Sequence, residues 1–299
     1  MRASAAGLDF YIVDVFAEKK YAGNQLAVVR KAAGLSTSTM QQIAREMHFS
    51  ETTFVISDEP RKGGYDVRIF TPASELPFAG HPVLGTAQVI RDEIIRKRVD
   101  RLKLNLKIGQ IPVRFGDKRE GSRLVWMRQK EPDFGEVFDR ATISKILNLE
   151  EKDIDSRFPI QDVTTGLATF VVPLRTMDAL KRAKVSTALY FELIERTRAK
   201  PLLVFSPETH EKGNDLSVRV FTDFAGIPED PATGSSNGCL AGYLAKHRYF
   251  GEDHIDVKVE QGYQIKRPSR LYLRAATHGD RIEVDVGGKV VPIAKGKLQ

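Results

Sequence analysis

The chain has 299 residues, of which 41% are hydrophobic and 28% are charged, so its composition is that of a folded globular protein rather than a disordered or fibrous one. At roughly 150 residues per domain this length favours two domains, although one large α/β unit would also fit. Lysine and arginine total 46 against 39 acidic residues, which gives a formal net charge of +7. This surplus permits an acidic ligand or a nucleic acid but identifies neither.

Several classes of protein are disfavoured by the sequence alone. A single cysteine, Cys239, excludes an intramolecular disulfide and a zinc finger. The densest basic segment, 91–107, contains three acidic residues and is interpreted as a solvated helix face, so we expect no nucleic acid partner. The N-terminal segment lacks the apolar core of a signal peptide, and no apolar run of about 18 residues occurs. We therefore expect a cytoplasmic protein with no membrane partner.

The first predicted helix lies at about 39–47, where apolar residues share one stripe and Ser38 with Gln41 fits a capping box. The segment HFSETTFVIS then leaves this helix and enters a strand, with Glu51 at the junction. Apolar residues on both sides of Glu51 suit a carboxyl group that transfers protons. A solvated junction residue is the alternative interpretation.

Two later segments share one pattern. VRIF at 67–70 and VRVF at 218–221 alternate apolar and basic residues, which predicts half-buried strands. Each is followed by a loop and by a run of small and apolar residues, which predicts a helix inside a core. These helices are expected to begin at Pro82 and Pro231, with His81 and Asp230 as their caps. The segment 176–197 lies between these two helices in the sequence, and its amphipathic pattern predicts one outer helix.

The two segments belong to an internal repeat. Residues 67–71 align with 218–222, and after a slip of two residues His81, Pro82, Gly85 and Thr86 align with Asp230, Pro231, Gly234 and Ser235. A weaker match relates Gly23 and the valines at 28–29 to Gly166 and the valines at 171–172. The chain is therefore expected to contain two copies of one plan, divided between 115 and 128, where GDKREGSR predicts a turn.

Cofactor motifs are scarce. Gly80 to Thr86 has the glycine spacing of a phosphate-binding loop but no lysine, and neither a dinucleotide fingerprint nor a metal-binding histidine pair occurs. A pyridoxal-binding lysine has no reliable local sequence signature, so the sequence neither identifies nor excludes one. The duplicated helix N-termini would form an anion site suited to a carboxylate if they faced one another. Alternatively, Asp230 is only a helix cap and His81 only a loop residue.

Four segments, DVFAEKKYAGNQLAVV, SETTFV, RIFTPASELPFAGHPVLGTA and EDPATGSSNG, together resemble the PhzF phenazine-biosynthesis family of the diaminopimelate epimerase superfamily. The resemblance implies an α/β (α+β) fold of two pseudo-symmetric domains, each a curved, mostly antiparallel sheet or barrel around a central helix, with the active site in the cleft between them. The domains would cover 1–120 and 121–285, with the last strand, about 286–299, packing back onto the first. It further implies a homodimer that needs no cofactor and no metal.

The resemblance also implies roles for particular residues. Glu51 matches the family's proton-transferring glutamate, and His81 and Asp230 match its polar catalytic partners. The positions matching the substrate-binding residues are Asn24, Ser50, Gly80, Thr233, Gly234 and Ser235. Two positions differ from the family pattern: Gln25 replaces the usual proline, and Lys266 stands where glycine is common, so that an added cation could alter substrate choice.

The expected function is that of an isomerase or epimerase that moves a proton on a small carboxylate substrate, of the trans-2,3-dihydro-3-hydroxyanthranilate isomerase type or a related one. Diaminopimelate epimerase itself uses two opposed thiols, which one cysteine cannot supply, and Cys239 is expected to be a buried small residue. The alternatives are a small-molecule-binding protein of the same fold without turnover and a basic nucleic-acid-binding protein.

Overall fold

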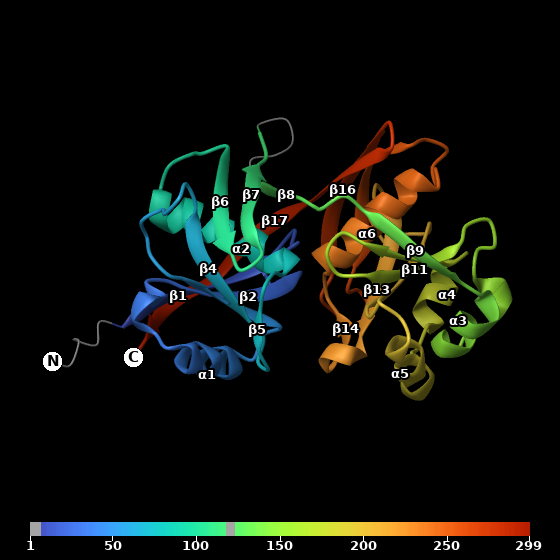
Figure 1. The fold of residues 1–299 in the computed structure, drawn as a ribbon, viewed down its shortest axis with the longest axis horizontal. Coiled ribbons are helices and arrows are strands. Elements are labelled where there is room, and N and C mark those ends of the chain that lie inside the picture. Colours follow the sequence, from blue (N-terminus) through green and yellow to red (C-terminus); the bar gives the residue numbers. More distant parts are fainter. Residues whose placement is uncertain (1–6, 118–122) are drawn as a thin grey trace. The chain divides into compact units, whose positions relative to one another are not determined.

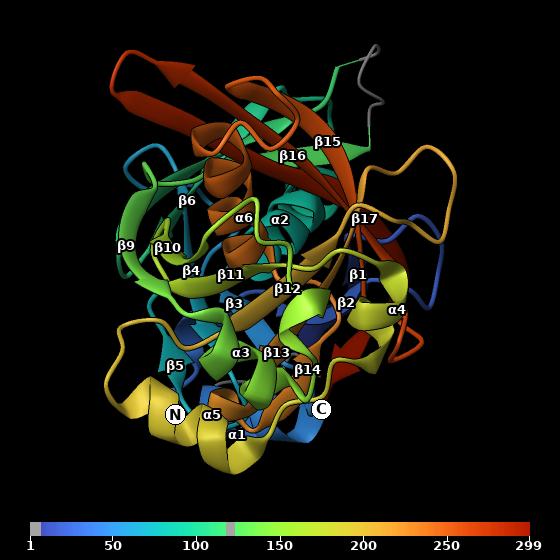
Figure 2. The same ribbon diagram turned by 90° about the vertical axis from the view of Figure 1, so that its right-hand side faces the viewer.

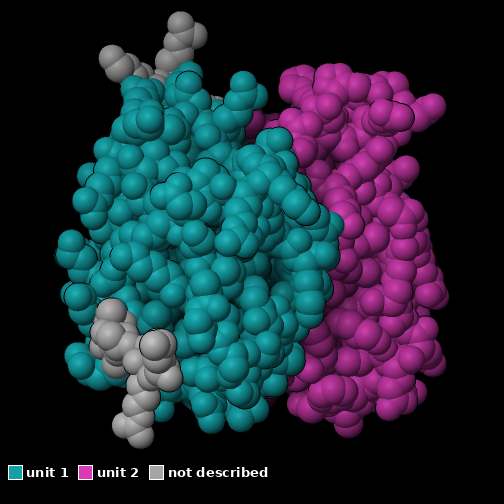
Figure 3. All heavy atoms as spheres, turned by 60° about the vertical axis from the view of Figure 1, so that its left-hand side comes forward, with its two compact units in different colours: residues 1–127, 287–299 teal, residues 128–286 magenta. Residues whose placement is uncertain are grey.

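A computed structural model describes residues 7–117 and 123–299, which form a mixed α/β fold (Figure 1). The chain divides into two compact units, coloured separately in Figure 3: residues 1–127 with 287–299, and residues 128–286. Most of the turn expected at GDKREGSR lies outside the described residues. Within the described chain, no helix is both long enough and apolar enough to span a membrane.

The first unit contains a closed barrel of eight strands. In the order β17, β1, β2, β3, β4, β6, β7 and β8, each strand pairs with the next, and β8 pairs with β17. The pairs β2–β3 and β4–β6 are parallel, and β5 adds a short antiparallel partner to β4. The strands are β1 (Leu8–Val15), β2 (Asn24–Val29), β3 (Glu51–Val55), β4 (Tyr65–Phe70), β5 (Glu75–Leu76), β6 (Arg101–Leu106), β7 (Gly109–Phe115), β8 (Leu124–Arg128) and β17 (Arg281–Leu298), of which residues 281–286 belong to the second unit.

The second unit is built from β9 to β16. Its pairings repeat those of the first unit in the same order: β10–β11 antiparallel, β11–β12 parallel, β12–β13 and β13–β14 antiparallel, β13–β15 parallel and β15–β16 antiparallel. The strands are β9 (Asp133–Phe138), β10 (Ile160–Thr164), β11 (Thr169–Pro173), β12 (Leu202–Ser206), β13 (Leu216–Thr222), β14 (Ile227–Asp230), β15 (His254–Gln261) and β16 (Ser269–His278).

Each unit is organised around one buried helix. All ten residues of α2 (Gly80–Val89) and eleven of the thirteen residues of α6 (Gly234–Lys246) are buried. A helix can be enclosed so completely only if its side chains are small where strands approach it. A Cβ atom on Gly85 would lie 2.5 Å from Leu26 Cδ2, and one on Gly242 would lie 2.8 Å from Pro132 Cβ. These central helices confirm the expectation from their small, weakly charged sequences.

Each unit contains an arginine–glutamate pair that joins corresponding strands. Arg68 on β4 makes two 2.8 Å hydrogen bonds to Glu75 on β5. Arg219 on β13 bonds Glu229 on β14 at 3.2 and 2.8 Å, and also donates to carbonyls at the end of α4. Each guanidinium lies over a phenylalanine ring, at 5.0 and 4.7 Å. The VRVF strand is consequently fully buried rather than half-buried, because its basic residue is paired inside the protein.

The outer helices differ from expectation in two places. α1 spans Thr37–Met47 and is capped by Ser36, which accepts a hydrogen bond from the Thr39 amide, so the predicted Ser38–Gln41 box is wrong. The segment 176–197 forms two helices, α4 (Met177–Arg182) and α5 (Thr187–Glu195), instead of one. The break occurs because the amides at 184 and 186 bond to carbonyls at the end of α3 (Arg140–Leu147). These three helices pack on the strands of the second unit (Figure 2).

The basic segment 91–107 is also not one helix. Only its first residues continue α2, as the π-helical turn η2 (Ile90–Ile95), and β6 begins at Arg101. Arg96 takes a left-handed conformation with φ of 54° and ends the helical part. Within residues 7–117 and 123–299, the short 3₁₀ turns are η1 (Ala32–Gly34), η3 (Glu151–Asp153) and η4 (Asp223–Ala225).

The close approach at Gly85 predicts the effect of enlarging it. Gly85→Val should lower the free energy of unfolding by about 1–3 kcal/mol, because the added atoms overlap Leu26 and Val15 in a packed core. Urea unfolding measures this change. The control is Gly34→Ala, where an added Cβ meets nothing within 4 Å. Equal stabilities of the two variants would contradict the packing account of α2.

Candidate functional site

Glu51 and His81 are brought together in the first unit. Glu51 is the first residue of β3, and His81 is the second residue of α2. Their side chains are 15% and 6% exposed, and Glu51 Oε2 lies 3.3 Å from His81 Nε2. Thirty residues of chain separate them, so the contact is created by β3 and α2 packing together inside the barrel.

The buried imidazole of His81 is neutral at physiological pH. Burial lowers the pKa of His81 to about 3, and a backbone hydrogen bond with Gln25 only partly opposes this. Asn24 Nδ2 lies 3.3 Å from His81 Nδ1, on the other side of the ring from Glu51. Because a neutral imidazole has one donor and one acceptor nitrogen, these two contacts bear on which of its nitrogens carries the proton.

Asn24 is held by the turn that precedes β2. The residue is 1% exposed and opens that strand directly after Gly23. Gly23 has a φ of 70°, and a Cβ atom there would lie 2.9 Å from Ala17 Cβ. Only glycine fits this turn without strain, so the glycine–asparagine pair of the resemblance has a local structural reason.

The start of α2 differs from the sequence-based expectation. The helix begins at Gly80 with Ala79 as its N-cap, so Pro82 is not its first residue and His81 is not its cap. The alternative that His81 is only a loop residue is also wrong, because the side chain lies within the first turn and is buried. An alanine cap offers no side-chain oxygen, and α2 has no side-chain cap hydrogen bond.

In the second unit, Asp230 is the last residue of β14 and pairs with Val220 in the ladder. It is therefore not a helix cap, and Pro231 does not open the helix. α6 begins at Gly234, with Thr233 as its N-cap in an extended conformation. The hydroxyl of Thr233 makes no cap bond and instead contacts Asp230 Oδ2.

The positions at which the two helices start also change how the two copies of the repeat align, because the sequence had matched His81 with Asp230. In both units the helix begins at a glycine, Gly80 or Gly234, and the preceding strand pairing places Phe70 opposite Glu75 and Phe221 opposite Glu229. Gly80 thus occupies the same helix position as Gly234. The position of His81 corresponds to Ser235 and not to Asp230.

The remaining predicted residues have clear positions. Ser50 is half-buried and directly precedes β3, and Ser235 is half-buried as the second residue of α6. Gln25 lies exposed in β2 opposite Asp14. Lys266 is exposed with a φ of 59°, a left-handed conformation that favours glycine and accounts for glycine being common there.

Cys239 is fully buried in α6, as expected. Its Sγ lies 3.7 Å from Thr165 Oγ1 and 3.5 Å from the Leu167 carbonyl, and burial raises the pKa of the thiol. A buried, protonated thiol is a poor nucleophile.

Sequence reasoning missed one residue of this region, Gln261 at the end of β15. Its side-chain amide forms hydrogen bonds with the Asp230 carbonyl and the Thr233 backbone amide. Gln261 lies 31 and 28 residues after these two partners in the sequence. No local motif marks it, because the contact depends on β15 lying beside β13 in parallel.

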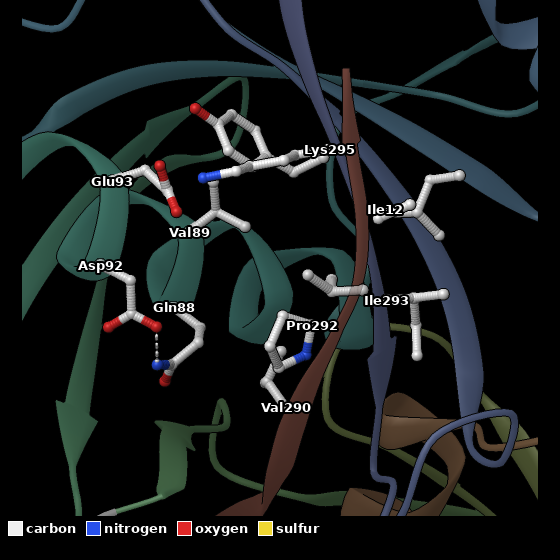
Figure 4. A pocket seen from close by; sticks show the side chains of 12 residues that line it. Ile12, Gln88, Val89, Asp92, Glu93, Val290, Pro292, Ile293 and Lys295 are labelled. Carbon is white, nitrogen blue, oxygen red and sulfur yellow. Dashed lines mark hydrogen bonds between the residues drawn. The ribbon is translucent and has the colours of Figure 1, made fainter.

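A cavity of about 220 Å³ in the first unit lies away from these residues. It is enclosed by β1, the end of α2 and β17, with apolar walls and the charged side chains of Asp92, Glu93 and Lys295 at its edge (Figure 4). None of the predicted site residues lines it. Among residues 7–117 and 123–299, no three histidine, cysteine or acidic side chains form a cluster that could hold a metal ion.

The protonation state of His81 predicts a pH dependence of stability. The unfolded chain binds a proton at its ordinary pKa of about 6.5, whereas folded His81 binds one only near pH 3, so acid favours the unfolded chain. His81 therefore lowers the free energy of unfolding as pH falls below about 6.5. His81→Asn should show a smaller loss than the parent between about pH 7 and about pH 5 in urea unfolding.

The control for this measurement is His278→Asn, which changes an exposed histidine and should keep the parental slope. If His81→Asn lost as much stability as the parent over the same interval, His81 would not be held neutral by burial.

Comparison with known proteins agrees with this fold. A family model described as phenazine biosynthesis-like protein matches residues 13–296. An enzyme of Pseudomonas aeruginosa named trans-2,3-dihydro-3-hydroxyanthranilate isomerase is 35% identical over 295 residues, covering 96% of this chain and 98% of the relative.

Solved structures are similar over almost the whole chain. A phenazine biosynthesis protein of the PhzF family from Bacillus anthracis has a TM-score of 0.89 at 26% identity and covers 98% of this chain and 99% of its own. A probable proline racemase from Agrobacterium radiobacter shares the fold, with a TM-score of 0.60 at 10% identity over 98% of this chain and 93% of its own. The chain therefore belongs to the PhzC–PhzF family of phenazine biosynthesis-like proteins, in which similar relatives are named isomerases.

Proposed function

We propose that this protein is a PhzF-like isomerase in which Glu51 removes a proton from one carbon of a small carboxylate substrate and returns it to another. The contact between Glu51 and the buried, neutral His81 is the observation that carries the proposal. The relative named trans-2,3-dihydro-3-hydroxyanthranilate isomerase supports that compound, or one like it, as the substrate.

The proposed chemistry conserves atoms and electrons. A carbon–hydrogen bond breaks as the Glu51 carboxylate accepts the proton, and the electron pair shifts through the adjacent double bond. A new carbon–hydrogen bond then forms at another carbon when Glu51 returns the proton. Nothing is oxidised or reduced overall, so the reaction requires no redox cofactor.

His81 would assist without changing its own charge. Its imidazole contacts the carboxylate oxygen of Glu51, and Asn24 contacts the opposite ring nitrogen. A neutral imidazole can orient the Glu51 carboxylate while it stays neutral itself, whereas a permanently charged one would hold the carboxylate as an ion pair. We assign Asp230 to the same reaction on the family resemblance.

The first turn of α2 and the first turn of α6 are each proposed to offer backbone amides to a negatively charged group. Neither helix has a side-chain cap, so backbone amides at Gly80, Gly234 and Ser235 suit a negatively charged group. Thr233 orients Asp230. The polar groups of Asn24 and Ser50 complete the proposed set.

The repeated order of strand pairings and the repeated arginine–glutamate pair support an internal duplication. We propose that the two compact units, 1–127 with 287–299 and 128–286, correspond to the two pseudo-symmetric PhzF-like domains expected at 1–120 and 121–285, with 286–299 joining the first. The resemblance further suggests a homodimer acting in the cytoplasm.

The first functional prediction concerns Glu51→Gln, which keeps the size of the side chain but cannot carry the proton. Turnover of trans-2,3-dihydro-3-hydroxyanthranilate should fall by about two to four orders of magnitude while binding largely survives. Incorporation of solvent deuterium into the acid measures the proton transfer directly.

Glu46→Gln on the exposed side of α1 is the matched control and should keep parental turnover. Parental deuterium incorporation by Glu51→Gln would remove Glu51 from the mechanism. A parent that binds the acid but incorporates no deuterium would be a binding protein without turnover.

The second functional prediction concerns the charge of the ligand. The parent should bind a substrate acid more tightly than the matching amide, because the helix termini stabilise a carboxylate. Gly234→Val should weaken acid binding, since a β-branched side chain at the start of α6 blocks approach to the backbone amides. Isothermal titration with the acid and the amide measures both effects, and equal affinity of the parent for the two ligands would reject the anion site.

A further inference from the structure

Gln261 organises the segment that carries Asp230. The side chain is 1% exposed at the end of β15, and its amide makes four hydrogen bonds with 230–237. Oε1 accepts from the Thr233 backbone amide at 3.2 Å and from Asn237 Nδ2 at 2.8 Å. Nε2 donates to the Asp230 carbonyl at 2.8 Å and to Thr233 Oγ1 at 3.0 Å.

The orientation of this amide follows from its backbone partners. The Thr233 N–H can only donate, and the Asp230 carbonyl can only accept, so Oε1 must face the first and Nε2 the second. The Gln261 Nε2 hydrogen then occupies one lone pair of the Thr233 hydroxyl. The single hydrogen of that hydroxyl is left to point at Asp230 Oδ2, which it contacts.

We propose that Gln261 is a positioning residue that fixes the Asp230 carboxylate through the hydroxyl of Thr233. It does so by holding both the backbone of the segment and the direction of one hydrogen bond. The inference rests on the proposed function only for its effect on turnover, because the hydrogen bonds themselves belong to the free protein.

A second anchor on the same segment has no such route to the carboxylate. Ser269 Oγ donates to the Pro231 carbonyl at 2.8 Å, and Gly262 has no room for a Cβ atom beside that carbonyl. These contacts fix the backbone alone. Gln261 and Thr233 provide a link that reaches the Asp230 carboxylate itself.

Two substitutions separate the two tasks of Gln261. Gln261→Leu has a similar size and removes all four hydrogen bonds. Gln261→Glu keeps an acceptor for the Thr233 amide but replaces the donor with a second acceptor. That second oxygen competes with Asp230 for the Thr233 hydroxyl hydrogen.

The first measurement is amide hydrogen exchange at Thr233, followed by NMR in the protein without ligand. In Gln261→Leu, the Thr233 amide should exchange about threefold to tenfold faster than in the parent, as expected for the loss of one hydrogen bond. In Gln261→Glu, it should keep its protection. Parental exchange in Gln261→Leu would overturn the inference, whatever substrate the protein uses.

The second measurement is turnover of trans-2,3-dihydro-3-hydroxyanthranilate in a double-mutant cycle with Asp230→Asn. Both Gln261 variants should lower kcat by about tenfold to a hundredfold, because a displaced catalytic group costs rate even when the fold survives. In the Asp230→Asn background the same variants should lower kcat by less than about threefold more, since their effect passes through Asp230.

Gln161→Leu is the matched control, because Gln161 is buried in the same unit and bonds the Gly135 carbonyl and His247 instead. It should keep parental kcat. Fully additive losses from the Gln261 variants and Asp230→Asn would mean that Gln261 does not act through Asp230, and the inference would fall. An inactive parent would refute the proposed substrate, and the exchange measurement would then decide the role of Gln261.

Discussion

The structure depends on enclosing one helix in each unit. A helix surrounded by strands must satisfy its backbone internally and present small residues where the strands come close. α2 and α6 meet this condition with glycines such as Gly85 and Gly242, at which a Cβ atom would overlap a neighbour. The body of each helix is filled by packing against the strands. Candidate residues such as His81, Thr233 and Ser235 lie at or just before the first turns, while Asn24 and Glu51 lie on the strands β2 and β3.

In the first unit, enclosure also sets the chemistry. His81 lies in the first turn of α2, so the packing that holds the helix also removes water from the imidazole and keeps it neutral. Asn24 and Glu51 approach its two nitrogens from neighbouring parallel strands, β2 and β3. The proton of the neutral His81 ring therefore lies among three side chains, those of Asn24, Glu51 and His81 itself, whose spacing is fixed by the barrel.

The second unit has the same succession of strand pairings but different polar residues beside its central helix. At the helix position of His81 it has Ser235, and its acidic group, Asp230, stands before the helix at the end of β14. A residue outside the helix needs its own support, which Thr233 and Gln261 supply through hydrogen bonds. The two units thus share a strand order and an arginine–glutamate pair, while the polar groups beside their helices differ.

The sequence alone was enough to identify the family, the central helices and the strand that begins at Glu51, because each depends on local composition or on contiguous motifs. It failed at the helix starts: prolines suggested Pro82 and Pro231, whereas strand pairing keeps Asp230 extended and moves the start of α6 to Gly234. It also joined α4 to α5, which hydrogen bonds from α3 separate. The contact between Glu51 and His81 and the role of Gln261 were decided only by tertiary structure, since the partners are distant in the chain and meet through the pairing of strands around a buried helix.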